Sequence, residues 1–194
     1  MSQSDRRSDA DLAQAAAGGD GRAYAELVRR HQDSLYRLLR RHVGDPDEAY
    51  EAAHEAFIAA WTALGRYDPS RPFGAWLRTI AINKARDRGR RLAVRRIIFG
   101  SRPSDEASAQ SAADPARPAD ETLIENAKLA ELDRAISGLP SNLKEALLLT
   151  AIEGRSQQEA GEILGVTAKT IETRVYRARK ALAQVLDLSI GNQN

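Results

Sequence analysis

Residues 100–121 constrain the fold more than any other part of this 194-residue chain. Apart from three prolines, the only hydrophobic residues between Gly100 and Glu121 are alanines, which are interspersed with serines and acids. Such a segment has no large apolar side chain to bury, so packing cannot offset the entropy cost of ordering it. The sequence therefore predicts a flexible acidic linker over 100–121, with one small domain over 1–99 and another over 122–194.

Charge is distributed unevenly along the chain, although the formal net charge is only +2. Seven basic residues and one acid lie between Lys84 and Arg96, and five basic residues oppose one acid between Thr167 and Gln184. Between residues 101 and 126, six acids oppose two arginines. Two basic segments that flank an acidic one favour a polyanionic partner such as nucleic acid, although basic runs are also common on solvated helix faces.

The composition and motifs exclude several classes of protein. The chain has no cysteine, which rules out a disulfide scaffold, a thiolate nucleophile and a cysteine-ligated metal. We expect no enzyme and no cofactor, because no nucleophile, base and phosphate loop are assembled. The spacing Glu51-x-x-His54 is half of a di-iron motif, but no second copy exists, so no metal is expected.

No segment of the sequence has the character of a membrane span or a secretory signal. The most apolar stretch, residues 146–152, is far shorter than the ~20 residues that cross a bilayer. The first residues lack the apolar core of a secretory signal. We therefore expect a cytoplasmic protein without membrane insertion.

Apolar residues recur at three- and four-residue intervals in both halves, which predicts an all-α fold. The expected helices are a short one before Gly18 and Gly19, residues 20–44, residues 45–64 with a stop at Gly65, the segment after a loop at 66–73, and residues 121–137, 141–153, 157–164 and 168–187. Trp61 and Trp76 recur with other apolar residues at helical spacing, so we expect both rings in the core.

The last two expected helices have the spacing of a helix-turn-helix. Ser156 and Glu159 form a capping box, Gly165 ends a short helix, and Thr167 caps a longer one after a tight turn. The early polar positions of that second helix would meet DNA base edges; they are Lys169, Thr170, Glu172, Thr173 and Arg174, and Arg177, Arg179 and Lys180 suit phosphates. The alternative is an ordinary helical hairpin with a basic face.

Two separate segments resemble one protein family. The run from LPSNLKEALL to ETRVYRAR resembles the sigma-4 domain of extracytoplasmic-function sigma factors of the sigma-70 family, which are bacterial transcription initiation factors. The runs EAFIAAW and DPSRPFGAWLRTIAINKARDRGRR resemble the sigma-2 domain of the same family. The resemblance implies a sigma-2 helical bundle and a sigma-4 helix-turn-helix joined by the linker.

The resemblance also assigns roles to residues. It implies polymerase binding by Glu51, His54, Glu55 and Phe57, and reading of the melted −10 element by Tyr67, Phe73, Asn83, Lys84, Arg86, Arg88 and Arg90. The helix that begins after Thr167 would read the −35 duplex. A polar group beside a cationic track suits a flipped base on a separated strand, which agrees with the position of Asn83. Implied partners are core RNA polymerase, promoter DNA and an anti-sigma factor.

The chain departs from the family pattern at Glu172, where a basic residue is frequent. A carboxylate there either accepts a hydrogen bond from cytosine or repels phosphate. Two alternative functions stay open from the residues alone, namely an autonomous operator-binding regulator and a helical protein-interaction module. Promoter binding by the protein alone, compared with binding in the presence of core polymerase, separates these functions.

Overall fold

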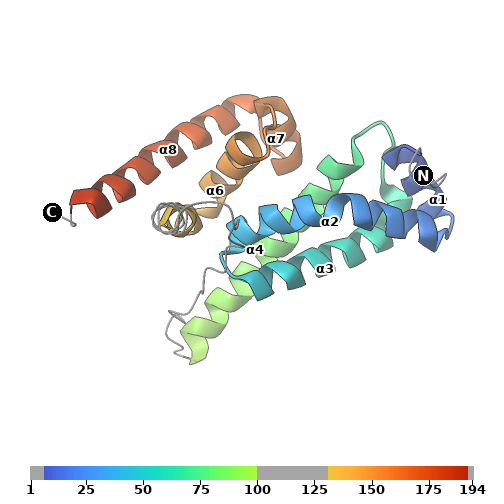
Figure 1. The fold of residues 1–194 in the computed structure, drawn as a ribbon, viewed down its shortest axis with the longest axis horizontal. Helices are drawn as coiled ribbons and strands as arrows, with labels where there is room; N and C mark the ends of the chain where they lie inside the picture. The colour runs from blue at the N-terminus through green and yellow to red at the C-terminus, as the bar shows by residue number, and fades with distance from the viewer. Residues whose placement is uncertain (1–6, 100–130, 192–194) are drawn as a thin grey trace, which may run out of the picture.

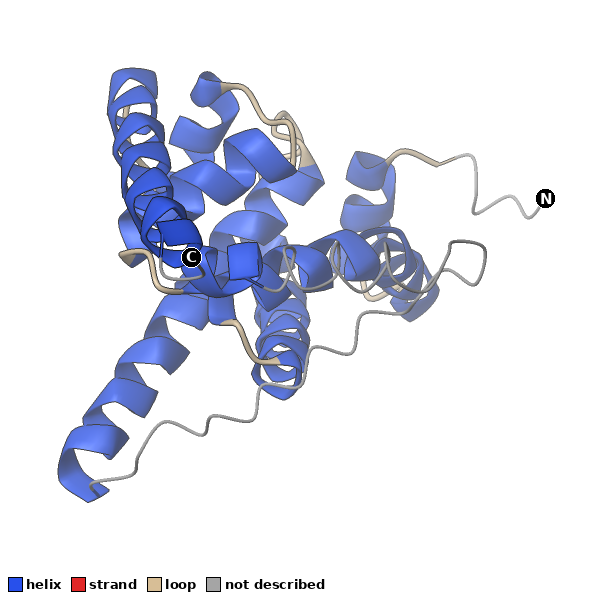
Figure 2. Cartoon of the chain, turned by 60° about the vertical axis from the view of Figure 1, so that its left-hand side comes forward, coloured by secondary structure: helices blue, strands red, loops and turns tan. Residues whose placement is uncertain are grey.

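The computed structural model describes residues 7–99 and 131–191, and every regular element in these ranges is a helix (Figures 1 and 2). The predicted all-α class is therefore confirmed. The N-terminal half contains α1 (Asp9–Ala17), α2 (Gly21–Val43), α3 (Pro46–Ala63) and α4 (Phe73–Phe99). The C-terminal half contains a helical segment over 131–137, followed by α6 (Ser141–Leu147), α7 (Gln157–Leu164) and α8 (Ala168–Gly191).

The helix boundaries follow the predicted capping signals. The Asp20 carboxylate accepts hydrogen bonds from two backbone N–H groups of α2, and Asp45 does the same for the N–H of Glu48 at the start of α3. Gly44 separates the two helices with a φ of +90°, a conformation that favours glycine.

The predicted stop of the third helix near Gly65 is confirmed, since α3 ends at Ala63 and a separate 3₁₀ turn, Leu64–Arg66, follows it. The predicted helix over 141–153 differs from the structure. A π-helical turn, Leu148–Ile152, follows α6 where an uninterrupted helix was expected. Of the helix expected at 121–137, residues 121–130 lie outside the described residues, as does the whole predicted linker, so the domain boundaries stay a prediction.

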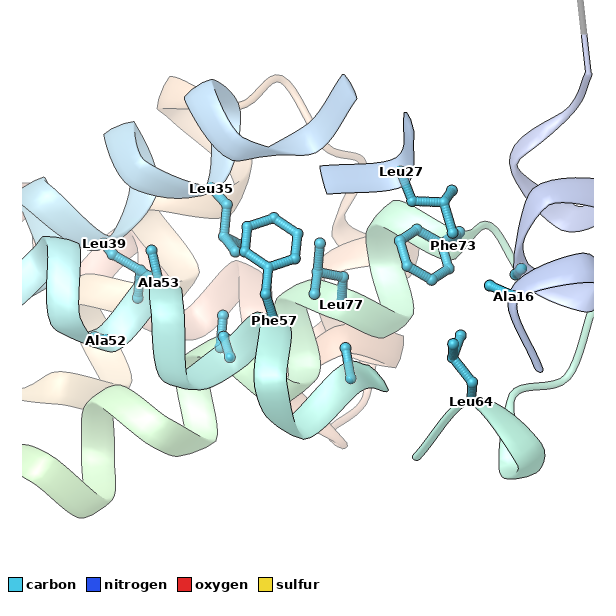
Figure 3. Packing of buried hydrophobic residues seen from close by; sticks show 14 of the residues in the cluster. Ala16, Leu27, Leu35, Leu39, Ala52, Ala53, Phe57, Leu64, Phe73 and Leu77 are labelled. Carbon is cyan, nitrogen blue, oxygen red and sulfur yellow. The ribbon is translucent and has the colours of Figure 1, made fainter. Parts of the chain in front are cut away.

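The N-terminal helices enclose one apolar core. Leu27, Leu35 and Leu39 of α2 face Phe57 of α3 and Leu77 of α4, and alanines of α3 allow the helices to approach closely (Figure 3). Trp76 packs partly buried against this core. The prediction for Trp61 is wrong, because its side chain is 42% exposed and packs edge-on against Tyr24 with ring centroids 4.8 Å apart.

The second apolar core contains side chains from both halves of the chain. Leu38 of α2 and Ile82 of α4 are buried together with Leu148, Leu149 and other residues of the C-terminal half. In Figure 1 α6 and α7 accordingly lie beside α2 and α4, and the red helix α8 packs on α6 and α7. The two halves therefore pack against each other instead of standing apart.

Candidate nucleic-acid interface

The helix-turn-helix predicted at 156–187 is present. The Ser156 hydroxyl accepts from the backbone N–H of Glu159 at 3.1 Å, and the Glu159 carboxylate accepts from the N–H of Ser156 at 2.9 Å. Gly165 ends α7 with a φ of +68°, and the Thr167 hydroxyl accepts from the N–H of Thr170. A Cβ atom at Gly161 would lie 2.6 Å from the Val166 carbonyl oxygen, so the turn packs directly on the glycine of α7.

Helix α8 separates an apolar face from a polar one as predicted. Ile171, Ala178 and Leu182 are buried against the second core, and Val175 is partly buried. The exposed side chains are Lys169, Glu172, Thr173, Tyr176, Arg177, Arg179 and Lys180. The polar face is therefore available to a ligand along three turns of the helix.

Glu172 is not an isolated carboxylate on this face. Lys169 Nζ lies 2.9 Å from Glu172 Oε2, and both side chains are exposed. The Thr173 hydroxyl donates to the Lys169 carbonyl oxygen at 3.0 Å, and the Thr170 and Thr167 hydroxyls lie 2.9 Å apart. The adjacent ammonium group offsets the negative charge that Glu172 would present to DNA.

Two residues of α8 differ from what the sequence predicted. Arg174 is only partly exposed and lines a cavity of about 600 Å³ between the two halves, together with Arg86 of α4. Tyr176, which was not a candidate, is 69% exposed beside Glu172 and Thr173 on the polar face. Its place one residue after the partly buried Val175 is the signal that could have identified it.

The predicted cationic track on α4 is engaged in ion pairs. Arg86 forms a two-point contact with Glu145 of α6, with Nε 2.7 Å from Oε1. Arg88 pairs with Glu48 and Glu55 of α3, and Arg90 pairs with Asp87. Asn83 is exposed, and its Oδ1 lies 3.4 Å from a guanidinium nitrogen of Arg86. Lys84 is partly exposed on the same helix.

An aromatic cluster lies where the loop after α3 meets the first turn of α4. Tyr67, Phe73 and Trp76 pack with ring centroids 5.1 to 5.5 Å apart. The Tyr67 hydroxyl donates to the Arg71 carbonyl oxygen at 2.6 Å, and burial raises the pKa of this phenol. Phe73 requires a correction, because it is 1% exposed inside the first core and its ring is not available to a DNA base (Figure 3).

Sequence analysis missed a buried polar network where the two halves meet. The Glu145 side chain is completely buried; it contacts Arg86 and lies 3.2 Å from His42 Nε2. Burial alone raises the pKa of this carboxyl, but hydrogen bonds from Arg86 and His42 outweigh burial, so the net pKa is lowered. Lys144 Nζ donates to the carbonyl oxygens of His42 and Ser137 at 2.9 and 2.6 Å, and burial lowers its pKa.

Arg78 and Glu153 form a second pair between the halves. Arg78 Nε lies 2.5 Å from Glu153 Oε2, Nη2 lies 3.1 Å from Oε1, and both side chains are nearly buried. Pairs such as this one join residues 75 positions apart in the chain. No local sequence pattern predicts these pairs, because helical periodicity does not reveal which two helices pack against each other.

The predicted polymerase-binding residues lie on α3. Glu51 and His54 are exposed, whereas Glu55 pairs with Arg88 and Phe57 is buried in the first core. The Phe57 prediction is therefore corrected to a structural role for most of its ring, although its edge lines a groove between α2 and α3. Large exposed apolar side chains surround this part of α3; they are Tyr50, Ile58 and Trp61.

Within residues 7–99 and 131–191 no three histidine or acidic side chains are placed to hold a metal ion. Nor is any helix in these ranges both long and apolar enough to cross a membrane.

The fold and the two cationic helices define a helix-turn-helix DNA-binding protein, and comparisons specify its family. Residues 27–95 match the model for sigma-70 region 2, and residues 129–182 match the model for sigma-70 region 4. The chain is 37% identical over 182 residues to the RNA polymerase sigma factor CnrH of Cupriavidus metallidurans, covering 92% of this chain and 95% of the relative. It is 32% identical to the ECF RNA polymerase sigma factor SigW of Bacillus subtilis, covering 87% and 91%.

Solved structures agree with this comparison. The structure of CnrH in complex with the cytosolic domain of CnrY superposes with a TM-score of 0.66 at 34% identity, covering 93% of this chain and 97% of that one. The chain belongs to the extracytoplasmic-function sigma factors of the sigma-70 family. It is accordingly an RNA polymerase sigma factor that acts in promoter-directed transcription initiation, and this family is not an enzyme class.

Proposed function

We propose that α8 reads the −35 element as a duplex. Its polar face carries three exposed cations beyond the first turn, Arg177, Arg179 and Lys180, which suit phosphate contacts on either side of a major groove. Thr170, Glu172 and Thr173 lie nearer the helix start, where side chains of a recognition helix meet base edges. We assign Arg174, which is partly exposed one turn after Thr170, to the same set.

The −10 element is assigned to α4 and the loop that precedes it. Asn83 offers an amide that can pair with the edge of an unpaired base, and Lys84, Arg86, Arg88 and Arg90 lie within two turns of it. Tyr67 is the aromatic residue of the loop that retains exposed surface for stacking, whereas Phe73 holds the loop to the core. We therefore assign the strand to the surface between Tyr67 and Arg90.

Polymerase binding is assigned to the exposed face of α3. Exposed apolar side chains beside acids are typical of a protein interface, where buried aromatic residues supply most of the affinity. Tyr50, Ile58 and Trp61 provide the apolar contacts, and Glu51 and His54 provide polar ones. Because polymerase and promoter DNA meet in the cytoplasm, we propose that the protein acts there.

An anti-sigma factor is a further proposed partner. CnrH, which this chain resembles over 93% of its length, has been solved with the cytosolic domain of CnrY, and RpoE of Bartonella quintana has been solved with the anti-sigma factor NepR. The groove between α2 and α3 and the exposed α3 face offer apolar surface to such a protein. Competition between a candidate anti-sigma protein and core polymerase tests this assignment.

The observation that carries the two-site proposal is the exposed Asn83 amide inside a cluster of cations on a helix separate from the helix-turn-helix. An operator-binding regulator needs only α7 and α8. We expect Asn83→Ala to weaken open-complex formation by about 1 to 3 kcal/mol, the cost of an unmet hydrogen bond, with little change in closed-complex binding.

The test measures permanganate reactivity of the melted region and closed-complex affinity with the same holoenzyme. Gln184→Ala is a suitable control, because this exposed amide lies on α8, far along the chain from the proposed strand surface. Unchanged permanganate reactivity in Asn83→Ala contradicts the role of Asn83. Tight, sequence-specific footprinting by the protein without polymerase contradicts the initiation mechanism as a whole.

A further inference from the structure

Helix α1 lies beside the loop over residues 67–72, which we assign to the −10 element. It contacts the 3₁₀ turn Leu64–Arg66 before the loop and helix α4 after it. Asp9 of α1 also lines a cavity of about 480 Å³ together with Tyr67 of the loop. The region 2 match begins at residue 27 and so does not include α1. The helix is therefore placed to influence the loop, although the sequence assigned it no function.

A carboxylate–imidazole pair joins α1 to α2. His31 Nε2 of α2 lies 2.6 Å from Asp9 Oδ2 at the start of α1, and the two side chains are only 16% and 31% exposed. Because an ionised carboxylate can only accept, the imidazole donates from Nε2. The second carboxylate oxygen, Oδ1, accepts from Arg30 Nη1 at 3.0 Å. Both oxygens of Asp9 are therefore held by α2, which fixes the start of α1 on this helix.

The same imidazole ring contacts the residues where the loop enters α4. Its centroid lies 5.4 Å from that of the Phe73 ring, which is buried in the first core. A Cβ atom at Gly74 would lie 3.3 Å from His31 Cε1 and 2.9 Å from Arg78 Nη1. The backbone of α4 passes this close to the ring because residue 74 is glycine. One side chain, His31, thus contacts both α1 and the end of the loop.

The contacts continue from His31 to the exposed part of the loop. The Phe73 ring lies 5.5 Å from the Tyr67 ring, and the Tyr67 hydroxyl donates to the Arg71 carbonyl oxygen at 2.6 Å. Burial and then the nearby charge of Asp9 raise the pKa of the Tyr67 phenol, so the carboxylate also acts on this residue directly. Tyr67 is the proposed stacking residue of the loop. Its position therefore depends on side chains that rest on His31 and Asp9.

We propose that Asp9 and His31 are a positioning pair, which holds the loop in the shape needed to discriminate between −10 sequences. This inference rests on the proposed function, because it assumes that the loop reads the −10 element. Both oxygens of Asp9 are occupied and His31 is mostly buried, so the pair acts through Phe73 and Tyr67 and not as a base contact. Groups that recognise a ligand discriminate well only when the packing around them fixes their geometry. Loosening the pair should therefore impair −10 discrimination and leave −35 discrimination by α8 intact.

Two substitutions separate the hydrogen bond of His31 from the bulk of its ring. His31→Phe keeps a ring but cannot donate to Asp9, whereas His31→Gln places an amide N–H near the position of Nε2. Asp9→Ala removes the acceptor instead. The matched control is Tyr24→Phe, which removes a different hydrogen bond of α2, from the Tyr24 hydroxyl to the Phe57 carbonyl oxygen. The test measures open-complex formation by each holoenzyme on an active promoter, on a copy with one substitution in the −10 element and on a copy with one substitution in the −35 element.

We expect His31→Phe and Asp9→Ala to reduce discrimination against the −10 copy about tenfold, comparable with the loss of one base contact, and to leave discrimination against the −35 copy unchanged. His31→Gln and Tyr24→Phe should discriminate like the parent protein. The double variant of Asp9→Ala and His31→Phe should lose no more than either single variant, because both remove the same contact.

Three outcomes overturn the positioning role of the pair. They are parent-like −10 discrimination by His31→Phe and Asp9→Ala, equal losses of −10 and −35 discrimination, and failure of His31→Gln to retain −10 discrimination. Circular dichroism identifies a variant that does not fold, and Asp9→Ala decides the test if His31→Phe is such a variant. A parent holoenzyme that does not distinguish the −10 copy from the active promoter instead overturns the proposed function.

Discussion

The outer face of α3 and the inner face of α4 are both proposed binding surfaces, yet they differ in accessibility. On α3, Tyr50 is 67% exposed and Ile58 and Trp61 also face solvent. On α4, Arg78 and Arg86 are engaged by carboxylates from the C-terminal half. The proposed polymerase surface on α3 is thus exposed, whereas the proposed DNA surface on α4 is covered by part of the same chain.

This difference indicates an order of events. If α3 binds polymerase as proposed, docking does not require the two halves to separate, and the binding energy is then available to favour a conformation in which they do. If DNA bound before polymerase, the DNA contacts alone would have to separate the two halves.

Removing a charge from the inner face of α4 should lower the free energy of unfolding more than any change on the outer face of α3. Arg78→Leu would leave the Glu153 carboxylate nearly buried and unpaired, so we expect a loss of about 3 to 5 kcal/mol in the free energy of unfolding. Arg78→Lys keeps the charge but loses the two-point geometry, and it should lose less. Urea denaturation of both variants measures this difference, and equal stability of Arg78→Leu and the parent protein would contradict it.

The covered face also depends on the shape of α7, which contacts α4 through a hydrogen bond from Thr79 to the Ile163 carbonyl oxygen. Gly161→Ala would push a Cβ atom against the Val166 carbonyl oxygen, and we expect a loss of about 1 to 3 kcal/mol. Gly89→Ala on α4 meets nothing within 4 Å and should gain up to about 1 kcal/mol. Thermal unfolding of the two variants should therefore shift in opposite directions.

Truncating an exposed side chain on the outer face of α3 should weaken polymerase binding but leave the stability of the protein nearly unchanged. We expect Tyr50→Ala to change the free energy of unfolding by less than about 0.5 kcal/mol but to weaken binding of core polymerase by about 1 to 2 kcal/mol. Tyr176→Ala is the matched control, because this tyrosine is equally exposed but lies on α8. Titration of labelled polymerase gives both affinities, and an equal loss for the two variants would reject the α3 assignment.

The smallest effect should come from pH. The pKa of Glu145 is lower than its ordinary value of about 4.5 when the two halves are packed together, so this carboxylate stabilises that packing fully above that value. Its contribution is lost as the pH falls below about 4.5 and through the lowered pKa. The radius of gyration from X-ray scattering should therefore rise more in acid for the parent protein than for Glu145→Gln, which keeps the Arg78–Glu153 pair, and equal rises would contradict this linkage.

Local features of the fold could be predicted from the sequence, because they depend on neighbouring residues. Caps at Asp20, Asp45 and Ser156 and the buried face of α8 follow from spacing alone. Trp61 was misplaced because helical spacing does not distinguish the edge of an apolar stripe from its centre. For the candidate nucleic-acid interface, the sequence predicted which residues carry suitable chemistry but not which contacts they make.

The partners of the site residues could not be predicted. Arg86 was assigned to DNA from its charge, but nothing near it in the sequence reveals Glu145, which lies 59 positions away. Phe73 was assigned to DNA by the family resemblance, but its ring is buried in the first core. Contacts between distant segments depend on how the helices assemble, and local patterns of spacing, charge and capping do not reveal that assembly.

Leu38 and Ile82 make the packing between the two halves dependent on temperature. Both side chains belong to N-terminal helices but are buried in the second core, so separating the halves brings them into contact with water. The free energy gained by burying apolar surface decreases on cooling. Burying apolar surface also lowers the heat capacity. The packing between the halves should therefore loosen as the temperature falls, so that a cooled chain exposes α4 more often than a warm one.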